Sequence, residues 1–275
     1  MKKRIGIVAK KLSHSLSPII HNEWIKKNNI NAEYICFEIK ESELQSFYDE
    51  FKRDKNFLGF NVTVPYKENF FHMCNNISKQ ASSIGSLNLI YKKNNLIYGD
   101  NTDYIGFAKT YKKIINKKIQ STLLIGAGGA ARSVLKFLND QKIEHIDILA
   151  RTKNKKRSLS EIMKFENFYT KTNKVKEKKY DLIINASDAG MKNKKLLDKE
   201  IYKLIPLASY AIDIIYNPLS TKFLKVAKEA QTPHIGGLNM LLEQAKPSFD
   251  RWFGSNVEIT KNLESKLIRK LKKND

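Results

Sequence analysis

Short apolar runs alternate with amphipathic stretches through the first hundred residues. Three runs have the apolar character of strands, namely residues 5–9, 34–39 and 59–64. Two stretches have the spacing of helices, namely residues 19–25 and 42–51. Ser17 and Pro18 stand just before the first of these helices, as a natural N-cap and a proline suited to the first turn. Alternation of this kind is typical of βαβ units, so we expect an α/β fold with a mainly parallel sheet.

A second alternating series begins near residue 121. Its predicted strands are residues 122–125, 145–150, 181–185 and 211–216. A glycine-rich segment and a helix through Leu138 follow the first of these strands. A helix at about 102–117 precedes the series, and a helix-rich tail from about 238 to 271 follows it. The sequence thus predicts two α/β units, with the boundary in the helix at about 102–117.

The composition is that of a folded protein. Of the 275 residues 41% are hydrophobic and 10% aromatic, which is enough for real cores and excludes a wholly disordered chain. No apolar run approaches the roughly 18–20 residues that span a bilayer, and Lys10 and Lys11 cut the N-terminal run short of a signal peptide. Cys36 and Cys74 form neither a disulfide framework nor a metal motif. We expect a reduced, cytoplasmic protein with no membrane partner and no metal ion.

The formal net charge of +22, taken alone, suggests an acidic partner such as a nucleic acid. However, 43 of the 50 cationic residues are lysine and only 7 are arginine, whereas recognition of phosphates and bases favours the bidentate fork of arginine. The lysines are also spread along the whole chain, often beside asparagine, as a bias towards A/T-rich codons would produce. We therefore expect no nucleic-acid partner.

The segment Gly126-Ala-Gly128-Gly-Ala-Ala131 directly follows a predicted strand and opens a helix. This context fits the dinucleotide fingerprint, in which Gly126 permits the tight turn and Gly128 lets the backbone approach the pyrophosphate. Ala131 keeps the helix close to the strand, and the helix N-terminus offers N–H donors to a phosphate. A purely structural glycine turn is the alternative.

The end of the next predicted strand distinguishes the two nicotinamide cofactors. An NAD enzyme usually has Asp or Glu about 20 residues further on, to hold the ribose 2′-hydroxyl. Here Ala150 is followed by Arg151 and Thr152, with three more cations at 155–157. A loop with cations and no carboxylate suits a 2′-phosphate, which arginine binds through charge-assisted hydrogen bonds. The sequence favours NADP(H), although a solvated basic loop would have the same composition.

Polar residues of the first half gather at element ends. Three serines fall within residues 13–17, and an N-cap role accounts for only the last of them. Alternation places Asn61 and Thr63 on one face of a strand, and Lys67 follows at its C-terminal rim, where open α/β sheets bind ligands. Residues 101–103, Asn-Thr-Asp, likewise precede a helix, where a simple Asx or N-cap turn is the alternative to a site role.

Taken together and in order, nine segments of the chain resemble the shikimate dehydrogenase family of the aromatic amino-acid pathway. They are spread along nearly the whole chain, and chance agreement of nine ordered motifs is not credible. The segments are Ser15–Pro18 with His21-Asn22, Gly59–Lys67, Gly85–Asn88, Gly99–Gly106, Gly126–Arg132, Arg151-Thr152, Asn185–Met191, Asp213–Pro218 and Gly237–Ala245.

The resemblance implies a reversible NADPH-dependent reduction of 3-dehydroshikimate to shikimate. It implies a substrate-binding domain of residues 1–103 with returning helices 238–275, and a Rossmann NADP-binding domain of residues 104–237. Lys67 and Asp103 match the catalytic pair of the family. The substrate would be held by Ser15, Ser17, Asn61, Thr63, Asn88, Tyr216 and Gln244. NADP(H) would be held by Gly126, Ala127, Gly128, Gly129, Ala130, Arg151, Thr152, Gly237 and Met240.

The chemistry of the reaction suits the implied catalytic pair. Hydride delivery to the C3 ketone leaves a developing alkoxide, which needs a proton or a nearby positive charge. A desolvated Lys67 can supply either, whereas Asp103 beside it would favour the ammonium form. The proton-transfer role is therefore assigned to the pair, with Lys67 as general acid/base or as electrostatic clamp.

Several positions depart from the family pattern without removing a catalytic group. Leu89, Ala150 and Asn239 replace a usual Thr, Asn and Gly. Asp188 replaces Ser or Thr in the loop expected near the nicotinamide, where its negative charge is expected to oppose cofactor phosphates. These departures bear on turnover and cofactor affinity, not on the fold.

Two other functions stay open. One is a quinate/shikimate dehydrogenase that accepts NAD, against which the missing acidic residue after Leu149 and the serine at position 17 speak. The other is a basic RNA-binding protein on a degenerate enzyme fold. Such a protein would be expected to lose some of Lys67, Asp103 and the glycine loop, which are intact. The expected assembly is a monomer or a homodimer.

Overall fold

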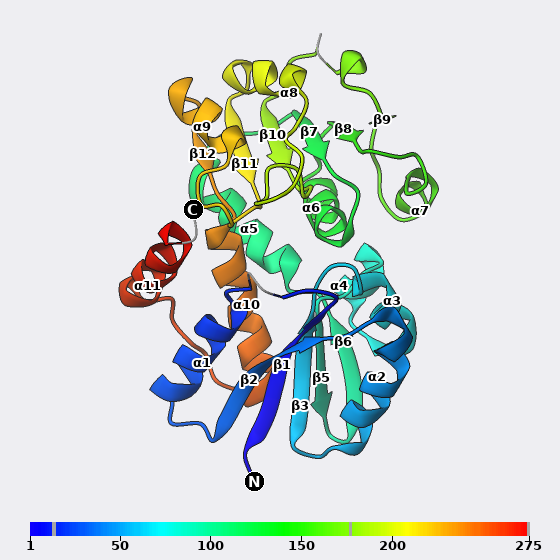
Figure 1. Cartoon of the computed structure of the whole chain (residues 1–275). Coiled ribbons are helices and arrows are strands. Elements are labelled where there is room, and N and C mark those ends of the chain that lie inside the picture. The colour runs from blue at the N-terminus through cyan, green and yellow to red at the C-terminus, as the bar shows by residue number, and fades with distance from the viewer. Residues whose placement is uncertain (13–14, 176–177, 274–275) are drawn as a thin grey trace. The chain divides into compact units, whose positions relative to one another are not determined.

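The computed structural model describes residues 1–12, 15–175 and 178–273 (Figure 1). The chain forms two compact units, one of Met1–Thr102 with Gln244–Leu267, the other of Asp103–Glu243 with the chain from Ile268 on. Ser13, which the sequence groups with two further serines, lies outside the described residues. None of the helices in the described ranges combines the length and apolar character needed to cross a bilayer.

The first unit is built on a six-stranded mixed sheet in the order β2-β1-β3-β5-β6-β4. Its strands are β1 (Lys3–Ala9), β2 (Ala32–Glu38), β3 (Phe57–Val62), β4 (Asn76–Ile77), β5 (Leu89–Lys93) and β6 (Leu96–Asp100). The predicted parallel pairing holds for β1 with β2 and β3, but β5 pairs antiparallel with both β3 and β6. The β5–β6 hairpin turns at Asn94 and Asn95, with φ of 50° and 60°, a left-handed conformation that asparagine tolerates.

Helices cover both faces of this sheet. They are α1 (Ser17–Lys27), α2 (Leu44–Arg53), α3 (Lys67–Met73), α4 (Lys79–Ile84) and parts of α10 (Leu238–Phe253) and α11 (Lys261–Lys272). Phe47 of α2 and Phe70 of α3 pack with Phe60 of β3 on one face. On the other, Trp252 of α10 lies so close to Gly59 that a Cβ there would be 2.4 Å from the indole nitrogen. Gly59 thus lets α10 approach the sheet.

The start of α1 differs from the prediction. The helix begins at Ser17 with Leu16 as its N-cap residue, and no side chain caps it. The N–H groups of Ile19 and Ile20 both reach the Leu16 carbonyl, so the helix starts one residue earlier than the pattern indicates. The predicted N-cap role of Ser17 is therefore wrong, and its side chain is buried without that task.

The second unit has an all-parallel six-stranded sheet in the order β12-β11-β10-β7-β8-β9. Its strands are β7 (Ser121–Ile125), β8 (His145–Leu149), β9 (Asn167–Tyr169), β10 (Leu182–Asn185), β11 (Tyr210–Asp213) and β12 (His234–Ile235). The predicted Rossmann-type sheet is confirmed. β11 ends at Asp213, not at residue 216, because the Asp213 carboxylate accepts the Ile215 N–H at 3.0 Å and turns the chain.

Helices also cover both faces of the second sheet. They are α5 (Asp103–Ile114), α6 (Gly129–Asp140), α7 (Lys156–Ser160), α8 (Lys199–Leu204) and α9 (Lys222–Glu229). The second unit also has 3₁₀ turns at Thr172–Lys174 and Ile205–Leu207, and the first unit has one at Glu41–Glu43. Leu124 of β7 belongs to the core formed with α5 and α6, and Leu123 to the core formed with α8 and α9. Burial on both sides explains why these strands are continuous apolar runs.

Candidate active site

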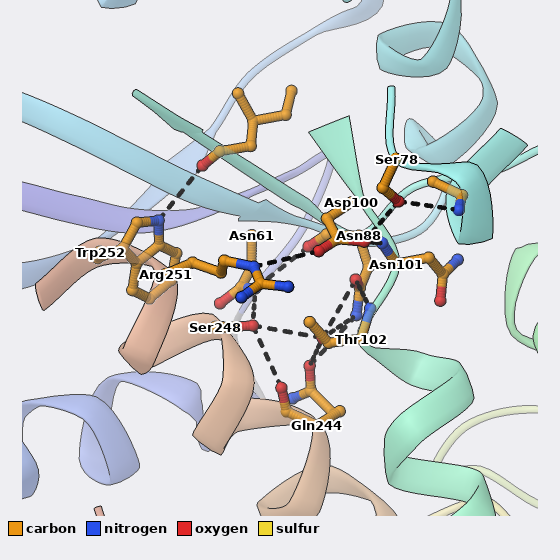
Figure 2. Close-up of polar contacts among 12 residues, drawn as sticks. Asn61, Ser78, Asn88, Asp100, Asn101, Thr102, Gln244, Ser248, Arg251 and Trp252 are labelled. Carbon is orange, nitrogen blue, oxygen red and sulfur yellow. Dashed lines mark hydrogen bonds and ion pairs between the residues drawn. The ribbon is translucent and has the colours of Figure 1, made fainter. Parts of the chain in front are cut away.

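Five polar side chains from both ends of the sequence form one buried, hydrogen-bonded cluster in the first unit (Figure 2). We call Asn61, Asn88, Thr102, Gln244 and Ser248 the amide cluster. The Asn61 amide donates to the Asn88 carbonyl and to Ser248 Oγ, both at 3.1 Å. The Asn88 amide donates to Thr102 Oγ1 at 2.9 Å and to Gln244 Oε1 at 3.2 Å. Each member is less than a tenth exposed, which requires such pairing.

The amide cluster contains three of the residues that the sequence predicts for the substrate, namely Asn61, Asn88 and Gln244. Thr102 and Ser248 are additional members that sequence reasoning missed. Thr102 stands in the family motif Gly99–Gly106 but received no role of its own, whereas its Oγ1 lies 3.2 Å from Gln244 Oε1. Ser248 is one helical turn after Gln244, a spacing that places both on one face of α10 and could have indicated it.

Helix α10 is fixed to the sheet by two residues near its end. Arg251 Nε lies 3.4 Å from Asp100 Oδ2, and Asp100 Oδ1 accepts the Ser78 hydroxyl at 2.6 Å (Figure 2). The Trp252 indole N–H donates to the Ile90 carbonyl at 3.3 Å. These contacts with β5 and β6 fix the helix that carries Gln244 and Ser248.

The remaining predicted substrate residues of the first unit are Ser15 and Ser17, before and at the start of α1, and Thr63, directly after β3. Ser17 is 4% exposed, and its N–H donates to Ser15 Oγ at 3.3 Å. Thr63 is partly exposed just beyond β3, and its N–H donates to the Val8 carbonyl at 3.1 Å. Thr63 thus lies at the carboxyl end of a parallel strand pair, the edge at which ligands bind in such sheets.

The two predicted catalytic residues each open a helix and are buried. Lys67 is the first residue of α3 and is 8% exposed. The preceding Tyr66 is buried and donates its hydroxyl to the Ile39 carbonyl at 2.7 Å, which fixes the start of the helix. Asp103 is the first residue of α5, 6% exposed, and belongs to the second unit.

The glycine loop between β7 and α6 has the geometry that a dinucleotide requires. Gly126 has φ +117°, and a Cβ there would lie 2.5 Å from the Ala186 carbonyl oxygen. Gly128 is different, because a Cβ built on it meets nothing within 4 Å. The Arg132 N–H donates to the carbonyl of the N-cap residue Gly128 at 3.0 Å, so the helix begins directly at this loop. The open side of Gly128 at a helix N-terminus fits a pyrophosphate.

The loop after β8 holds the predicted 2′-phosphate residues. Arg151 has a side chain that is 85% exposed, and its Nη2 lies 3.4 Å from Asp188 Oδ1. Thr152 donates its hydroxyl to Asn154. Ala150 continues the sheet through a bond from its N–H to the Tyr169 carbonyl at 2.9 Å. The exposed guanidinium is available to a phosphate, but a carboxylate lies beside it.

Three predicted residues lie near the ends of β11 and β12. Tyr216 is partly buried, and burial raises its pKa to about 12, so its hydroxyl stays a hydrogen-bond donor. Gly237 allows close packing, because a Cβ there would lie 2.0 Å from the Ile214 carbonyl oxygen. Met240 is 6% exposed within the core of the second unit. Close packing against Ile214 therefore explains the glycine at position 237 without any cofactor.

Comparison with known proteins decides the family. Residues 7–90 match the shikimate dehydrogenase substrate binding domain, and residues 109–214 match shikimate / quinate 5-dehydrogenase. A shikimate dehydrogenase (NADP(+)) of Clostridium perfringens is 36% identical over 98% of both chains. The chain belongs to the shikimate dehydrogenase family. The family predicted from the nine motifs is thus confirmed.

Solved structures of the shikimate dehydrogenase family share the fold described above. The enzyme of Aquifex aeolicus is 33% identical, covers 98% of both chains and superposes with a TM-score of 0.85. The enzyme of Thermus thermophilus, solved in complex with NADP(H) and shikimate, is 27% identical with a TM-score of 0.83, over 98% of this chain and 99% of that one.

Proposed function

We propose that this chain is an NADP-dependent shikimate dehydrogenase that reduces 3-dehydroshikimate reversibly to shikimate. The observation that carries the proposal is the amide cluster of the first unit. It presents amides and hydroxyls from β3, α10 and the ends of β5 and β6, in a chain similar along its whole length to enzymes of this name. A polyol acid suits such a site, since unmatched hydroxyls in a closed site are costly.

The family resemblance supplies the substrate residues of this proposal. The residues assigned to the hydroxyls and carboxylate are Ser15, Ser17, Asn61, Thr63, Asn88, Tyr216 and Gln244. We retain the assignment of residues 1–103 with 238–275 to the substrate and of 104–237 to the cofactor.

Lys67 and Asp103 are assigned to the proton. When bound, NADPH supplies the hydride, and the alkoxide that develops at C3 needs a proton or a cation beside it. Lys67 is buried, so its interaction with the developing charge is stronger than at an exposed position. Asp103, buried at the start of α5, is assigned to the same proton-transfer step.

The residues present fit NADP(H). Gly126, Ala127, Gly128, Gly129 and Ala130 form the open turn at the start of α6 and would hold the pyrophosphate. Arg151 and Thr152 would hold the adenosine 2′-phosphate. Gly237 and Met240 are assigned to the nicotinamide side of the site.

The test follows NADPH absorbance with 3-dehydroshikimate as substrate. We expect turnover in the wild-type protein and a loss of kcat of about 10²–10⁴-fold in Lys67→Ala and in Asp103→Asn. Shikimate binding and thermal unfolding of each variant show whether the site and the fold survive. Full activity of Lys67→Ala would contradict the catalytic assignment, and absence of shikimate oxidation with either cofactor would refute the function.

We also infer a cytoplasmic location and a monomeric or homodimeric assembly. Cys36 is exposed and Cys74 is buried, and both are free, as is usual where thiols stay reduced. Light scattering on the purified protein tests the assembly, and a trimer or larger form would contradict it.

A further inference from the structure

A carboxylate lies beside the arginine that the proposed function assigns to the 2′-phosphate. Asp188 Oδ1 lies 3.4 Å from Arg151 Nη2, and Asp188 Oδ2 lies 3.8 Å from Lys194 Nζ. Arg151 follows β8 and Asp188 follows β10, so two separate loops supply this pair. Asp188 is also the position at which the family usually has Ser or Thr, so this chain carries an extra negative charge there.

The loop of Asp188 is held firmly, whereas the arginine is not. Asn185, which is fully buried, donates from its amide to the Ala189 carbonyl and to Asp213 Oδ1, both at 3.1 Å. Its Oδ1 accepts the Ser187 hydroxyl at 2.7 Å. These bonds fix the backbone on both sides of Asp188. The Arg151 side chain is 85% exposed, whereas that of Asp188 is 34% exposed and extends from this fixed backbone.

We propose that Asp188 weakens the preference of this enzyme for NADP(H) over NAD(H), because its carboxylate competes with the 2′-phosphate of NADP(H) for Arg151. The inference rests on the proposed function. A 2′-phosphate brings about −1.5 to −2 charges to Arg151 and must share the guanidinium with Asp188 or displace it. NAD(H) has no such group and meets no such competition. Asp188 therefore narrows the preference for NADP(H) that Arg151 creates.

The size of the effect follows from where the charges lie. An exposed ion pair contributes little on its own, so releasing Arg151 costs little. The larger effect is repulsion between two anions at one guanidinium, which at a surface dielectric corresponds to roughly a three- to tenfold change in affinity. Such repulsion is screened by salt, so the effect should shrink as ionic strength rises.

The test measures binding of adenosine 2′,5′-bisphosphate and of 5′-AMP by titration calorimetry, in the wild type and in Asp188→Asn. We expect the variant to bind the 2′,5′-bisphosphate about three to ten times more tightly at low salt, with 5′-AMP affinity changed by less than about twofold. The ratio of kcat/KM for NADPH to that for NADH should rise by a similar factor. Unchanged or weaker binding of the bisphosphate would overturn the inference.

Two further variants make the result specific. Glu144→Gln removes the same charge at the opposite end of β8, where Glu144 pairs with Lys118 at 3.2 Å, and should leave both affinities unchanged. In an Arg151→Ala background the bisphosphate loses the guanidinium that brings it beside Asp188, so the effect of Asp188→Asn should become smaller. If Arg151→Ala alone does not weaken the bisphosphate, the cofactor assignment of the proposed function fails. If it does weaken it and Asp188→Asn changes nothing, only the role of Asp188 fails.

Discussion

Asn61 on β3 donates its side-chain amide to the hydroxyl of Ser248 on α10 at 3.1 Å, although 187 positions separate the two residues in the chain. Ser248 is fully buried, and its hydroxyl also lies 3.3 Å from Thr102 Oγ1 and donates to the Gln244 carbonyl at 3.2 Å. One serine therefore connects three members of the amide cluster and holds Asn61 in a fixed orientation.

Ser248→Ala should weaken substrate binding more than catalysis. The change removes one of the two acceptors of the Asn61 amide, leaving the Asn88 carbonyl, and it also removes a contact of Thr102 (Figure 2). We expect KM for shikimate to rise about three- to tenfold and the free energy of unfolding to fall by about 1–3 kcal/mol. Steady-state kinetics and urea unfolding measure the two effects.

Ser133→Ala is the matched control for Ser248→Ala. Ser133 is a fully buried serine of α6 whose hydroxyl also bonds the carbonyl four residues earlier, that of Gly129, at 3.4 Å. Its KM for shikimate should equal that of the wild type. A Ser248→Ala enzyme with unchanged KM for shikimate would show that the hydroxyl does not position the site.

Much of the fold could be predicted because local sequence patterns determine many of its helices and strands. The strand, glycine turn and helix at 121–140 follow from a continuous apolar run, two glycines in a fixed spacing and an amphipathic stretch, and the structure places all three. Burial on both faces made the strands of the second unit easy to identify. The hairpin β5–β6 was harder, since Tyr91, Lys92 and Lys93 give it a mixed pattern with one exposed end.

The parts that could not be predicted depend on contacts across the chain. Nothing near Ser248 indicates that its hydroxyl reaches Asn61, because that contact exists only once α10 packs on β3. Ser17 shows the opposite error, since a local cap pattern was present but Leu16 provides the helix start. His21 appears in the sequence only as part of a motif, and its environment is formed by residues far away in the chain.

His21 makes the first unit sensitive to acid. The imidazole is fully buried, stacks on Tyr34 with ring centroids 4.4 Å apart, and contacts Phe249 and Trp252. Among the described residues neither of its ring nitrogens has a hydrogen-bond partner. Burial lowers its pKa to about 3. The unfolded chain, with a histidine pKa near 6.5, therefore binds a proton more readily than the folded one between these two values.

His21→Phe should remove this acid sensitivity. Above pH 6.5 His21 does not lower the free energy of unfolding. Below pH 6.5 the free energy of unfolding falls by about 1.4 kcal/mol for each pH unit, down to about pH 3. Phe keeps the aromatic stack without an ionisable group. Relative to the wild type, the unfolding free energy of the variant should therefore be about 3 kcal/mol more favourable at pH 4 than at pH 7. Urea unfolding at pH 7, 5.5 and 4 measures this difference.

Comparing the two proteins at each pH separates His21 from other groups. Burial raises the pKa of Asp213 to about 6, so the stability that this carboxyl contributes is lost as the pH rises from about 4 to 6, the opposite direction. Because Asp213 is present in both proteins, its contribution cancels in the difference. Parallel stability curves for wild type and His21→Phe would mean that the imidazole is not held neutral by burial.

The two glycines of the cofactor loop should respond differently to the same substitution. In Gly126→Ala the new Cβ would lie 2.5 Å from the Ala186 carbonyl oxygen at a φ of +117°, so the loop must shift, and we expect a loss of about 2–4 kcal/mol in unfolding free energy. In Gly128→Ala the Cβ meets nothing within 4 Å, so thermal stability should stay near that of the wild type.

The methyl group of Gly128→Ala would occupy the space assigned to the pyrophosphate, and Kd for NADPH should rise at least about tenfold. Thermal unfolding and NADPH fluorescence titration give the two readouts, and normal NADPH affinity in a stable Gly128→Ala protein would place the pyrophosphate elsewhere.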